Sequence, residues 1–404
     1  MRKRISIDQL KIGMKVEKLD RSWLATPFLR HRFTITSPVQ IEQLRVSGVQ
    51  QLDIEIGDTG KDSGSVMPTE AEASQPMARP EKPEPPLVPF AEELPGARQA
   101  YRAAKLIVQQ AMEDVRMGRA LKMEAVSDVV GSMVDSILRS PDALTSLTRL
   151  KQFDEYTFFH SVNTSALALS VGRHLGYART PLLQLGTGML LHDIGKTLIP
   201  LEILNKPGRY QVDEFEIMKQ HVMRGAEVLS NTTGLTDVFL NPTLEHHERV
   251  DGTGYPHRRS KIDLSQFGLI AAIVDIYDAV TSDRCYHKGK TPHDTLQMLY
   301  RLGGQGHVDG TLVQQFVQVV GVYPVGSCVS LNTGESAIVK QFNRHAPIRP
   351  LVVLIKDEVG RHRSSPIDLD LPAQLCTPHR TIASTLDPTA LGIDPCTFLD
   401  KEAA

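Results

Sequence analysis

Histidine and aspartate residues recur in five short clusters in the middle of the chain. The clusters are His160, His192-Asp193, His221, His246-His247 and Asp275. Imidazole and carboxylate together suit iron, manganese or zinc, whereas calcium and magnesium prefer oxygen ligands alone. Five histidines and two aspartates exceed what one four- to six-coordinate ion needs. The set therefore predicts two divalent ions that share a bridging carboxylate.

The pair His192-Asp193 is the most informative cluster. It ends the apolar run 182–191, which predicts a helix that carries both side chains into the protein interior. A charged aspartate buried there requires a cation or an ionic partner. Asp193 is our candidate bridge and a candidate catalytic residue, because one carboxylate offers two oxygens. A hydrogen-bonded His-Asp pair of the core is the alternative.

The remaining clusters are weaker when each is considered alone. His221 lies in an amphipathic helix expected around 215–222, where a lone histidine is more often structural. Asp275 lies in the apolar stretch 270–280, where a carboxylate is costly without a partner. The adjacent histidines 246 and 247 end a helical segment that we expect to begin near Pro242. Adjacent helical residues project about 100° apart, so both reach metal only at a helix end or between two ions.

Two further polar residue patterns need a separate explanation. His293-Asp294 follows Thr291-Pro292, which predicts a helix start and not a ligand pair. Lys196 follows His192 by four residues and would share its face if the helix continued. Lys196 is our second candidate catalytic residue, because a lysine can bind a scissile phosphate as a point charge. A helix C-terminal cation is the alternative role.

The order of these clusters resembles that of the HD phosphohydrolase superfamily. Residues 246–256, with the sequence HHERVDGTGYP, are similar to the signature of the HD-GYP family, and so are 192–196 and 275–284. The resemblance covers about 150–320 and extends into the residues that follow. It implies hydrolysis of the bacterial second messenger cyclic di-GMP to linear pGpG, with GMP as a further product. Spacing alone implies only a two-metal hydrolase.

The resemblance also implies roles for individual residues. It implies that all seven residues of the five clusters bind metal. It implies substrate contacts for Lys196, Gly254, Tyr255, Pro256, Arg284 and Lys288. The Gly-Tyr-Pro loop would border the active site and bind partner proteins with diguanylate cyclase domains; a plain turn is the alternative. A surface charge is the alternative for Arg284, and His287 is the alternative to Lys288 as the basic residue that follows it.

The residue at position 156 bears on how many metal ions we expect. Some family members are thought to bind a third metal through a glutamate four residues before the first histidine, and here that residue is Tyr156. A phenol with a pKa near ~10 stays neutral and is a poor replacement for a carboxylate. We therefore expect two ions, with iron or manganese favoured.

Composition limits the class of protein. The 404 residues carry 45 Lys+Arg against 47 Asp+Glu, a formal net charge of -2. A globally basic surface is absent, which disfavours nucleic acid as a partner. Four widely spaced cysteines indicate neither a disulfide framework nor a zinc knuckle. With no signal peptide and no apolar run of about 18 residues, we expect a cytoplasmic protein without a transmembrane segment.

The elements that must position the clusters are mainly helical. We expect a helical HD-type bundle with a small β appendage, preceded by a small α/β module and a disordered linker. The expected parts are the module at 1–57, the Pro-rich linker at 58–96, a helical segment at 97–141, the catalytic bundle at 142–322, and a β-hairpin with an irregular tail at 323–404. Residues 10–14 and 22–23 resemble an uncharacterised module often found before HD-GYP domains.

Two other functions remain compatible with the sequence. One is an HD hydrolase of another nucleotide phosphoester, which a complete Gly-Tyr-Pro loop disfavours. The other is a non-catalytic cyclic di-GMP sensor or scaffold, a class expected to lose metal ligands. No ligand of the five clusters is lost here.

Overall fold

The computed structural model describes the chain in several ranges. They are 2–11, 13–19, 33–35, 41, 44–45, 49–55, 87–149, 156–282, 289–343, 346–374, 379–388, 391–393 and 395–399. The description below refers to these residues. None of the helices among them combines the length and the apolar character needed to cross a membrane.

The N-terminal part is a small antiparallel sheet with the strand order β1-β4-β2-β3. Its strands are β1 (Arg2–Ser6), β2 (Lys15–Leu19), β3 (Phe33–Thr34) and β4 (Gln51–Glu55). Alternation of apolar and polar residues at 5–7 and at 52–56 predicts half-buried strands. They are present as β1 and β4, and Ile5 and Leu52 are buried in the small core of this sheet. The sequence also predicts a helix at Val39–Val46, ended by Gly48, and this segment lies largely outside the described residues.

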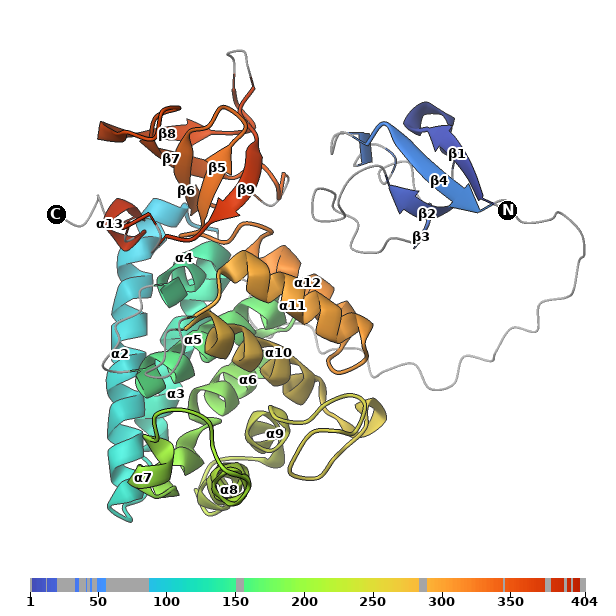
Figure 1. Cartoon of the computed structure of the whole chain (residues 1–404). Coiled ribbons are helices and arrows are strands. Elements are labelled where there is room, and N and C mark those ends of the chain that lie inside the picture. Colours follow the sequence, from blue (N-terminus) through green and yellow to red (C-terminus); the bar gives the residue numbers. More distant parts are fainter. Residues whose placement is uncertain are drawn as a thin grey trace, which may run out of the picture.

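The middle of the chain forms the expected helical bundle (Figure 1). Its first helices are α2 (Phe90–Arg116), α3 (Met123–Arg139), α4 (Pro141–Ser146), α5 (Tyr156–His174) and α6 (Arg179–Leu191). They are followed by α7 (Leu201–Leu204), α8 (Val212–Ser230), α9 (Asp237–Glu245), α10 (Gln266–Thr281), α11 (Pro292–Gly304) and α12 (Gly310–Val320). A short 3-10 helix, η5 (Ile194–Leu198), follows α6.

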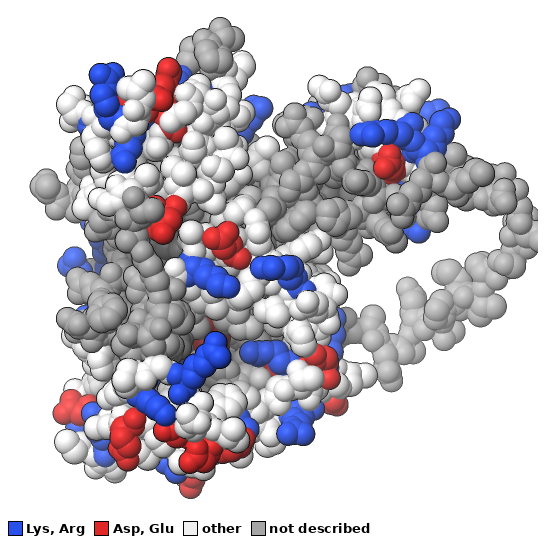
Figure 2. Space-filling view, in the orientation of Figure 1, with Lys and Arg blue, Asp and Glu red and all other residues white. Residues whose placement is uncertain are grey.

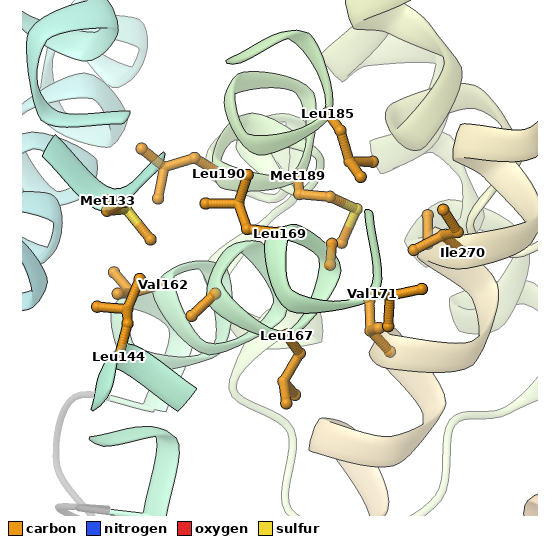
Figure 3. Packing of buried hydrophobic residues seen from close by; sticks show 14 of the residues in the cluster. Met133, Leu144, Val162, Leu167, Leu169, Val171, Leu185, Met189, Leu190 and Ile270 are labelled. Carbon is orange, nitrogen blue, oxygen red and sulfur yellow. The ribbon is translucent and has the colours of Figure 1, made fainter. Parts of the chain in front are cut away.

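Helix α5 lies at the centre of the bundle and contacts α2, α3, α6, α10 and α12. Its side chains Leu167 and Leu169 are buried, together with Leu185 and Met189 of α6 and Ile270 of α10 (Figure 3). All residues from 160 to 172 are buried, so α5 is covered on every face although it also carries polar residues. Each fully buried side chain of this size contributes about 1.5–3 kcal/mol. The same packing holds the histidine of α5 in the interior.

Two expected boundaries in the helical region are wrong. The linker does not extend to residue 96, because α2 begins at Phe90 and its buried Glu93 pairs with Arg139 of α3 at 2.6 Å. Prolines 89 and 95 made this stretch resemble the linker, yet Pro89 is only the N-cap residue and Pro95 is accommodated within the helix. Helix α9 begins at Asp237, so Pro242 also lies inside a helix.

A five-stranded antiparallel sheet follows the bundle, with the order β8-β7-β6-β5-β9. The strands are β5 (Cys328–Leu331), β6 (Ser336–Gln341), β7 (Leu351–Lys356), β8 (His362–Asp370) and β9 (Ile382–Leu386). The expected hairpin is present as β5 and β6, and the apolar residues at 350–356, which predict a further strand, form β7. The expectation of an irregular tail is wrong, because β8 and β9 complete the sheet. Both are largely exposed edge strands. The alternation of apolar and polar residues in β8 is confined to 367–370 and follows Pro366, so the strand signal in the sequence is weak.

Candidate metal centre

The seven histidine and aspartate side chains predicted to bind metal converge inside the bundle. His160 lies on α5, His221 on α8 and Asp275 on α10. The other four follow helix ends: His192 is the C-cap of α6, Asp193 precedes η5, His246 is the C-cap of α9, and His247 comes next. Adjacent residues within a helix would point in different directions. Because His246 and His247 follow the end of α9, both side chains can face the centre, and their ring centroids are 4.0 Å apart.

Two glycines bring η5 against α8. A Cβ atom on Gly195 would overlap the backbone carbonyl of His221 and the backbone nitrogen of Gly225. Any larger residue at 195 would therefore push η5 away from α8. The close approach places Asp193 beside His221, although they are far apart along the chain.

Asp193 lies between two pairs of imidazoles. Its Oδ1 is 3.4 Å from Nε2 of His221 and 3.7 Å from Nε2 of His246. Its Oδ2 is 3.5 Å from Nε2 of His160 and 3.5 Å from Nε2 of His192. Each carboxylate oxygen thus faces a different pair of ring nitrogens.

The two pairs are extended into two groups of three donors. In the first group, donor atoms of His221, His246 and His247 lie within 4.8 Å of one another. In the second, His160 and His192 are joined by Asp275, whose Oδ1 is 3.1 Å from Nε2 of His160. With one oxygen of Asp193, each group offers four donor atoms, the number typical of a divalent metal site.

The other ring nitrogen of several histidines is held by the protein. Nδ1 of His192 lies 2.7 Å from the carbonyl oxygen of Met189, and Nδ1 of His221 lies 2.7 Å from that of Met218. Nδ1 of His246 lies 2.9 Å from the carbonyl oxygen of Pro242. A carbonyl only accepts, so each Nδ1 must donate and each Nε2 must present a lone pair to the centre. Carbonyl partners of this kind orient metal-binding histidines.

Some buried polar atoms of the centre have no hydrogen-bond partner among the described residues. They are Nε2 of His192 and Oδ1 of Asp193. Nε2 of His221 and Nε2 of His246 face each other at 3.4 Å, with a lone pair on each. Buried acceptors without donors are unfavourable, and cations between them would remove the penalty. The donor set therefore fits bound divalent cations.

The protonation states favour cation binding as well. Burial lowers the pKa of His221 and of His246 to about 4, so both imidazoles are neutral at pH 7. Burial alone would raise the pKa of Asp193, but the positive charge of Lys196 and the neighbouring histidines hold it well below its usual value. The pKa of Asp275 is likewise held well below its usual value, against the effect of burial, by the neighbouring imidazoles of His160 and His247. Neutral imidazoles and ionised carboxylates are the forms that bind metal.

Lys196 lies next to the centre, but on a 3-10 turn and not on a continuation of the helix that precedes His192. Helix α6 ends at Leu191, and the 3-10 turn of η5 brings Nζ of Lys196 to 2.5 Å from Oδ2 of Asp193. The Lys196 side chain also borders an open cleft of about 690 Å³. The cleft is lined further by Gln109, Met112, Glu113, Arg116, Met117, Phe158, Thr197, Leu201, Leu204 and Asn205. Lysine and arginine side chains are interspersed with acidic ones on the face seen in Figure 2, and its described residues form no continuous basic surface.

The Gly-Tyr-Pro loop lies directly against the centre. The ring of Tyr255 stacks on that of His247, with centroids 4.6 Å apart. A Cβ atom on Gly254 would overlap the backbone of Glu248, whose buried carboxylate accepts a 2.7 Å hydrogen bond from the backbone nitrogen of His257. Pro256 follows Tyr255 through a cis peptide bond. The loop is thus held by the turn that carries His247.

Two of the candidate substrate contacts lie in a part of the chain that the structure does not describe, and the His293-Asp294 pair begins a helix, as expected. Arg284 and Lys288 lie outside the described residues. Thr291 caps α11 by accepting a hydrogen bond from the backbone nitrogen of Asp294, so the sequence His293-Asp294 begins a helix.

Sequence reasoning missed residues that support the ligands. Oδ2 of Asp278 accepts a 2.8 Å hydrogen bond from Nδ1 of His160, and Oδ1 accepts a 3.0 Å bond from Nδ2 of Asn163. The signal available was spacing, since Asp278 follows Asp275 by three residues and shares its helix face. No local pattern marks Asn163.

Comparison with known proteins agrees with this description. Residues 2–126 match a domain of unknown function (DUF3391), residues 132–312 match the HD domain, and residues 328–392 match a KOW domain associated with the HD domain. The helical bundle and its histidine–aspartate centre are thus those of an HD-domain protein.

Relatives define the family more narrowly. The chain is 37% identical over 353 residues to cyclic di-GMP phosphodiesterase PA4108 of Pseudomonas aeruginosa, covering 87% of this chain and 84% of that protein. It is 36% identical over 129 residues to 3'3'-cGAMP-specific phosphodiesterase 2 of Vibrio cholerae, covering 32% of this chain and 24% of that protein. Among solved structures, Bd1817, an HDG"Y"P protein from Bdellovibrio bacteriovorus, aligns with a TM-score of 0.47 at 16% identity, over 78% of this chain and 98% of that chain. The chain belongs to the HD-GYP family of HD-domain proteins.

Proposed function

We propose that this protein hydrolyses cyclic di-GMP to linear pGpG with two divalent metal ions. The proposal depends mainly on one observation: the two oxygens of Asp193 face two different pairs of imidazoles, and each pair belongs to a group of three donor atoms. Two adjacent ions joined by one carboxylate are characteristic of enzymes that cleave phosphate esters. A relative of 37% identity, matched over most of both chains, is named a cyclic di-GMP phosphodiesterase.

The geometry supports one assignment of ligands. We assign His221, His246 and His247 to one ion and His160, His192 and Asp275 to the other, with Asp193 bridging. A mixed set of imidazole and carboxylate suits iron or manganese, which we propose as the resident metals.

Asp193 and Lys196 would have different roles in the hydrolysis of a phosphodiester. When bound, the ions would lower the pKa of a water and neutralise charge on the phosphoryl oxygens. Asp193 would contact both ions, because its carboxylate is fully buried and each of its oxygens faces a different pair of imidazoles. The Lys196 ammonium would contact a phosphate oxygen, since its side chain borders the cleft and reaches the centre.

The rest of the substrate would lie in the space that adjoins Lys196. The cleft of about 690 Å³ falls within the usual range for small-molecule sites. On the His247 side, we propose that Gly254, Tyr255 and Pro256 line the entrance, because Tyr255 covers His247. Arg284 and Lys288 remain proposed substrate contacts from the family resemblance.

Two further roles rest on the same resemblance. We propose the Gly-Tyr-Pro loop as a contact for proteins with diguanylate cyclase domains, since Thr253 and His257 on either side are exposed. We also propose that the protein acts in the cytoplasm, where the second messenger would be encountered.

A second candidate substrate is another cyclic dinucleotide. A relative of 36% identity over 129 residues is named for 3'3'-cGAMP. The centre acts on a phosphodiester and does not by itself select a base. A non-catalytic sensor is disfavoured, because all seven proposed ligands are present and converge.

The experiment is a substrate panel on protein purified without oxygen and loaded with Fe²⁺ or Mn²⁺. Cyclic di-GMP, 3'3'-cGAMP, cyclic di-AMP and a linear nucleotide phosphoester are compared at equal concentration, and the products are separated by chromatography. We expect the highest kcat/KM for cyclic di-GMP and pGpG as the first product. Preference for another substrate would replace the proposed function, and no turnover by metal-loaded protein would favour the sensor.

A further inference from the structure

A chain of buried hydrogen bonds connects helix α2 to one of the proposed metal ligands. The hydroxyl of Tyr101 lies 2.6 Å from Oδ1 of Asn163. Nδ2 of Asn163 lies 3.0 Å from Oδ1 of Asp278, and Oδ2 of Asp278 lies 2.8 Å from Nδ1 of His160. Nε2 of His160 is the atom that faces Asp193 and Asp275.

The direction of every bond in this chain is fixed by Asp278. An ionised carboxylate only accepts, so the NH₂ group of Asn163 must point toward Asp278 and its oxygen toward Tyr101. Tyr101 must then donate its hydroxyl proton. At the other end, Nδ1 of His160 must carry a hydrogen, and in the neutral form of the ring, which is the form that binds metal, the lone pair then lies on Nε2. One arrangement of donors therefore satisfies all three bonds and prepares His160 to bind a cation.

Water does not compete with these bonds, because the participants are in the interior. The exposed fractions are 5% for Tyr101, 1% for Asn163, 2% for Asp278 and 2% for His160. The Tyr101 ring also stacks against Phe159, the residue before His160, with centroids 6.3 Å apart. Burial, with a smaller contribution from the charge of Asp278, raises the pKa of the Tyr101 hydroxyl, so it remains a donor.

Tyr101 lies outside the part of the chain that matches the HD domain. That match begins at residue 132, whereas Tyr101 falls in the range 2–126 that matches the domain of unknown function. Helix α2 nonetheless packs against α5, and Tyr101 is its point of contact with this hydrogen-bond chain. The boundary between the two matched regions therefore does not separate α2 from the metal centre.

We propose that Tyr101 is a positioning residue for metal binding, acting through Asn163 and Asp278 to orient His160. Helix α2 thereby contributes to the metal affinity of the centre although it supplies no ligand. The proposal rests on the proposed metal site and is independent of which nucleotide is hydrolysed.

The test compares Tyr101→Phe with a matched control in the full-length protein. Phenylalanine keeps the ring and removes only the hydroxyl, so the Asn163 amide loses one of the two hydrogen bonds of this chain that hold it. Loss of a partner that orients a metal ligand typically weakens metal binding, and we expect roughly tenfold weaker Mn²⁺ affinity. The control is Tyr177→Phe, because Tyr177 is another buried tyrosine of the same core and packs against Phe267. We expect its Mn²⁺ affinity to stay within about twofold of wild type.

Mn²⁺ affinity is measured by competition with a chelator, and the unfolding temperature is measured on metal-free protein. A purely structural role would lower the unfolding temperature and leave Mn²⁺ affinity unchanged, which would overturn the proposal. Equal losses of affinity in Tyr101→Phe and Tyr177→Phe would overturn it as well.

The path is tested with Asn163→Ala. If Tyr101 acts through Asn163, Tyr101→Phe should change Mn²⁺ affinity by less than about twofold in the Asn163→Ala background. A full tenfold effect in that background would show that the path is wrong. Should Tyr101→Phe fail to fold, Asn163→Ala alone decides: weaker Mn²⁺ binding supports the chain, and unchanged binding overturns it.

Discussion

Nζ of Lys196 lies 2.5 Å from Oδ2 of Asp193, the oxygen that also lies 3.5 Å from Nε2 of both His160 and His192. The ammonium of Lys196 therefore contacts the same carboxylate oxygen that faces the two imidazoles, at the position proposed for one of the metal ions. A bound ion and the lysine would compete for that oxygen. The same lysine would be available to a phosphate once an ion takes its place beside Asp193.

This relationship predicts opposite effects of Lys196→Met on binding and on turnover. Removing the competing charge should tighten Mn²⁺ binding, whereas loss of the phosphate contact should lower kcat/KM for cyclic di-GMP roughly a hundredfold. Lys206→Met is the control, since Lys206 pairs with Glu214 at 2.5 Å, away from the seven ligands. Chelator competition and initial rates measure the two effects. Weaker Mn²⁺ binding in Lys196→Met would contradict the prediction.

The buried histidines predict how the metal-free protein responds to acid. Burial lowers the pKa of His221 and His246 to about 4, below their ordinary value of 6.5. Below pH 6.5 the unfolded chain takes up protons that the folded chain does not, so stability falls as the pH drops toward 4. The lowered pKa of Asp193 acts only below its ordinary value of 3.8. Within the window from pH 6.5 to 4.5, the part above about pH 5.5 therefore reports mainly on histidines, while carboxyl groups of lowered pKa, such as those of Glu93 and Glu335, add to the fall nearer pH 4.5.

We expect the unfolding temperature of metal-free protein to fall steadily across that window. His221→Gln should show a shallower fall, because about one proton fewer is taken up on unfolding. Calorimetry at a series of pH values makes the comparison. An unfolding temperature that does not change between pH 6.5 and 4.5 would argue against neutral, buried imidazoles.

The start of α2 predicts where the chain can be cut. A fragment that begins at Leu87 keeps all of α2 and should fold and retain hydrolysis without the N-terminal module, with altered regulation as one consequence. A fragment that begins at Ala97 loses Glu93, whose two oxygens accept bonds of 2.6 and 2.9 Å from Arg139. We expect this shorter fragment to be less stable by about 2 kcal/mol in urea unfolding. Failure of the Leu87 fragment to fold would make residues 1–57 part of the bundle's core.

Tyr156 bears on the number of ions and on the product. Helix α5 begins at Tyr156, one turn before His160, although the side chain of Tyr156 itself lies outside the described part of the chain. We expect about two metal equivalents per chain and pGpG as the main early product. Tyr156→Glu should raise the metal content or shift the product toward GMP, and Tyr156→Gln, which adds no charge, should do neither. Three tightly bound equivalents with rapid GMP formation in the wild type would contradict the expectation.

The sequence was enough to predict the residues that converge at the proposed metal centre, but not the residues that support them. His192-Asp193 and Asp275 stand out because charged groups are costly in apolar runs, and the structure brings them together. Asn163 and Tyr101 carry no such signal, because a buried polar residue is recognisable only when its partner, 62 residues away in this case, is known. Lys196 would share the helix face of His192 only if the helix continued, and spacing alone does not predict the turn that follows Leu191.

In the sheet that follows the bundle, too, the sequence predicts the buried elements better than the ones that depend on a partner. β6 and β7 are buried and apolar enough to be predicted, with Val339 and Val352 fully covered. β8 is an edge strand with mostly exposed residues and pairs only with β7. Its position depends on a partner strand and not on its own pattern, which is why propensity alone missed it.

The most direct measurement is the metal content and activity of Asp193→Ala compared with wild type, after loading both with Mn²⁺ and removing free metal. Because each oxygen of Asp193 faces a separate group of donors, losing the carboxylate should affect both ions at once. We expect wild type to retain about two equivalents and Asp193→Ala well under one, with hydrolysis of cyclic di-GMP reduced by at least about a thousandfold. The helical circular dichroism of the variant should be unchanged. A folded Asp193→Ala protein that keeps both ions and full activity would contradict the bridging role on which the account depends.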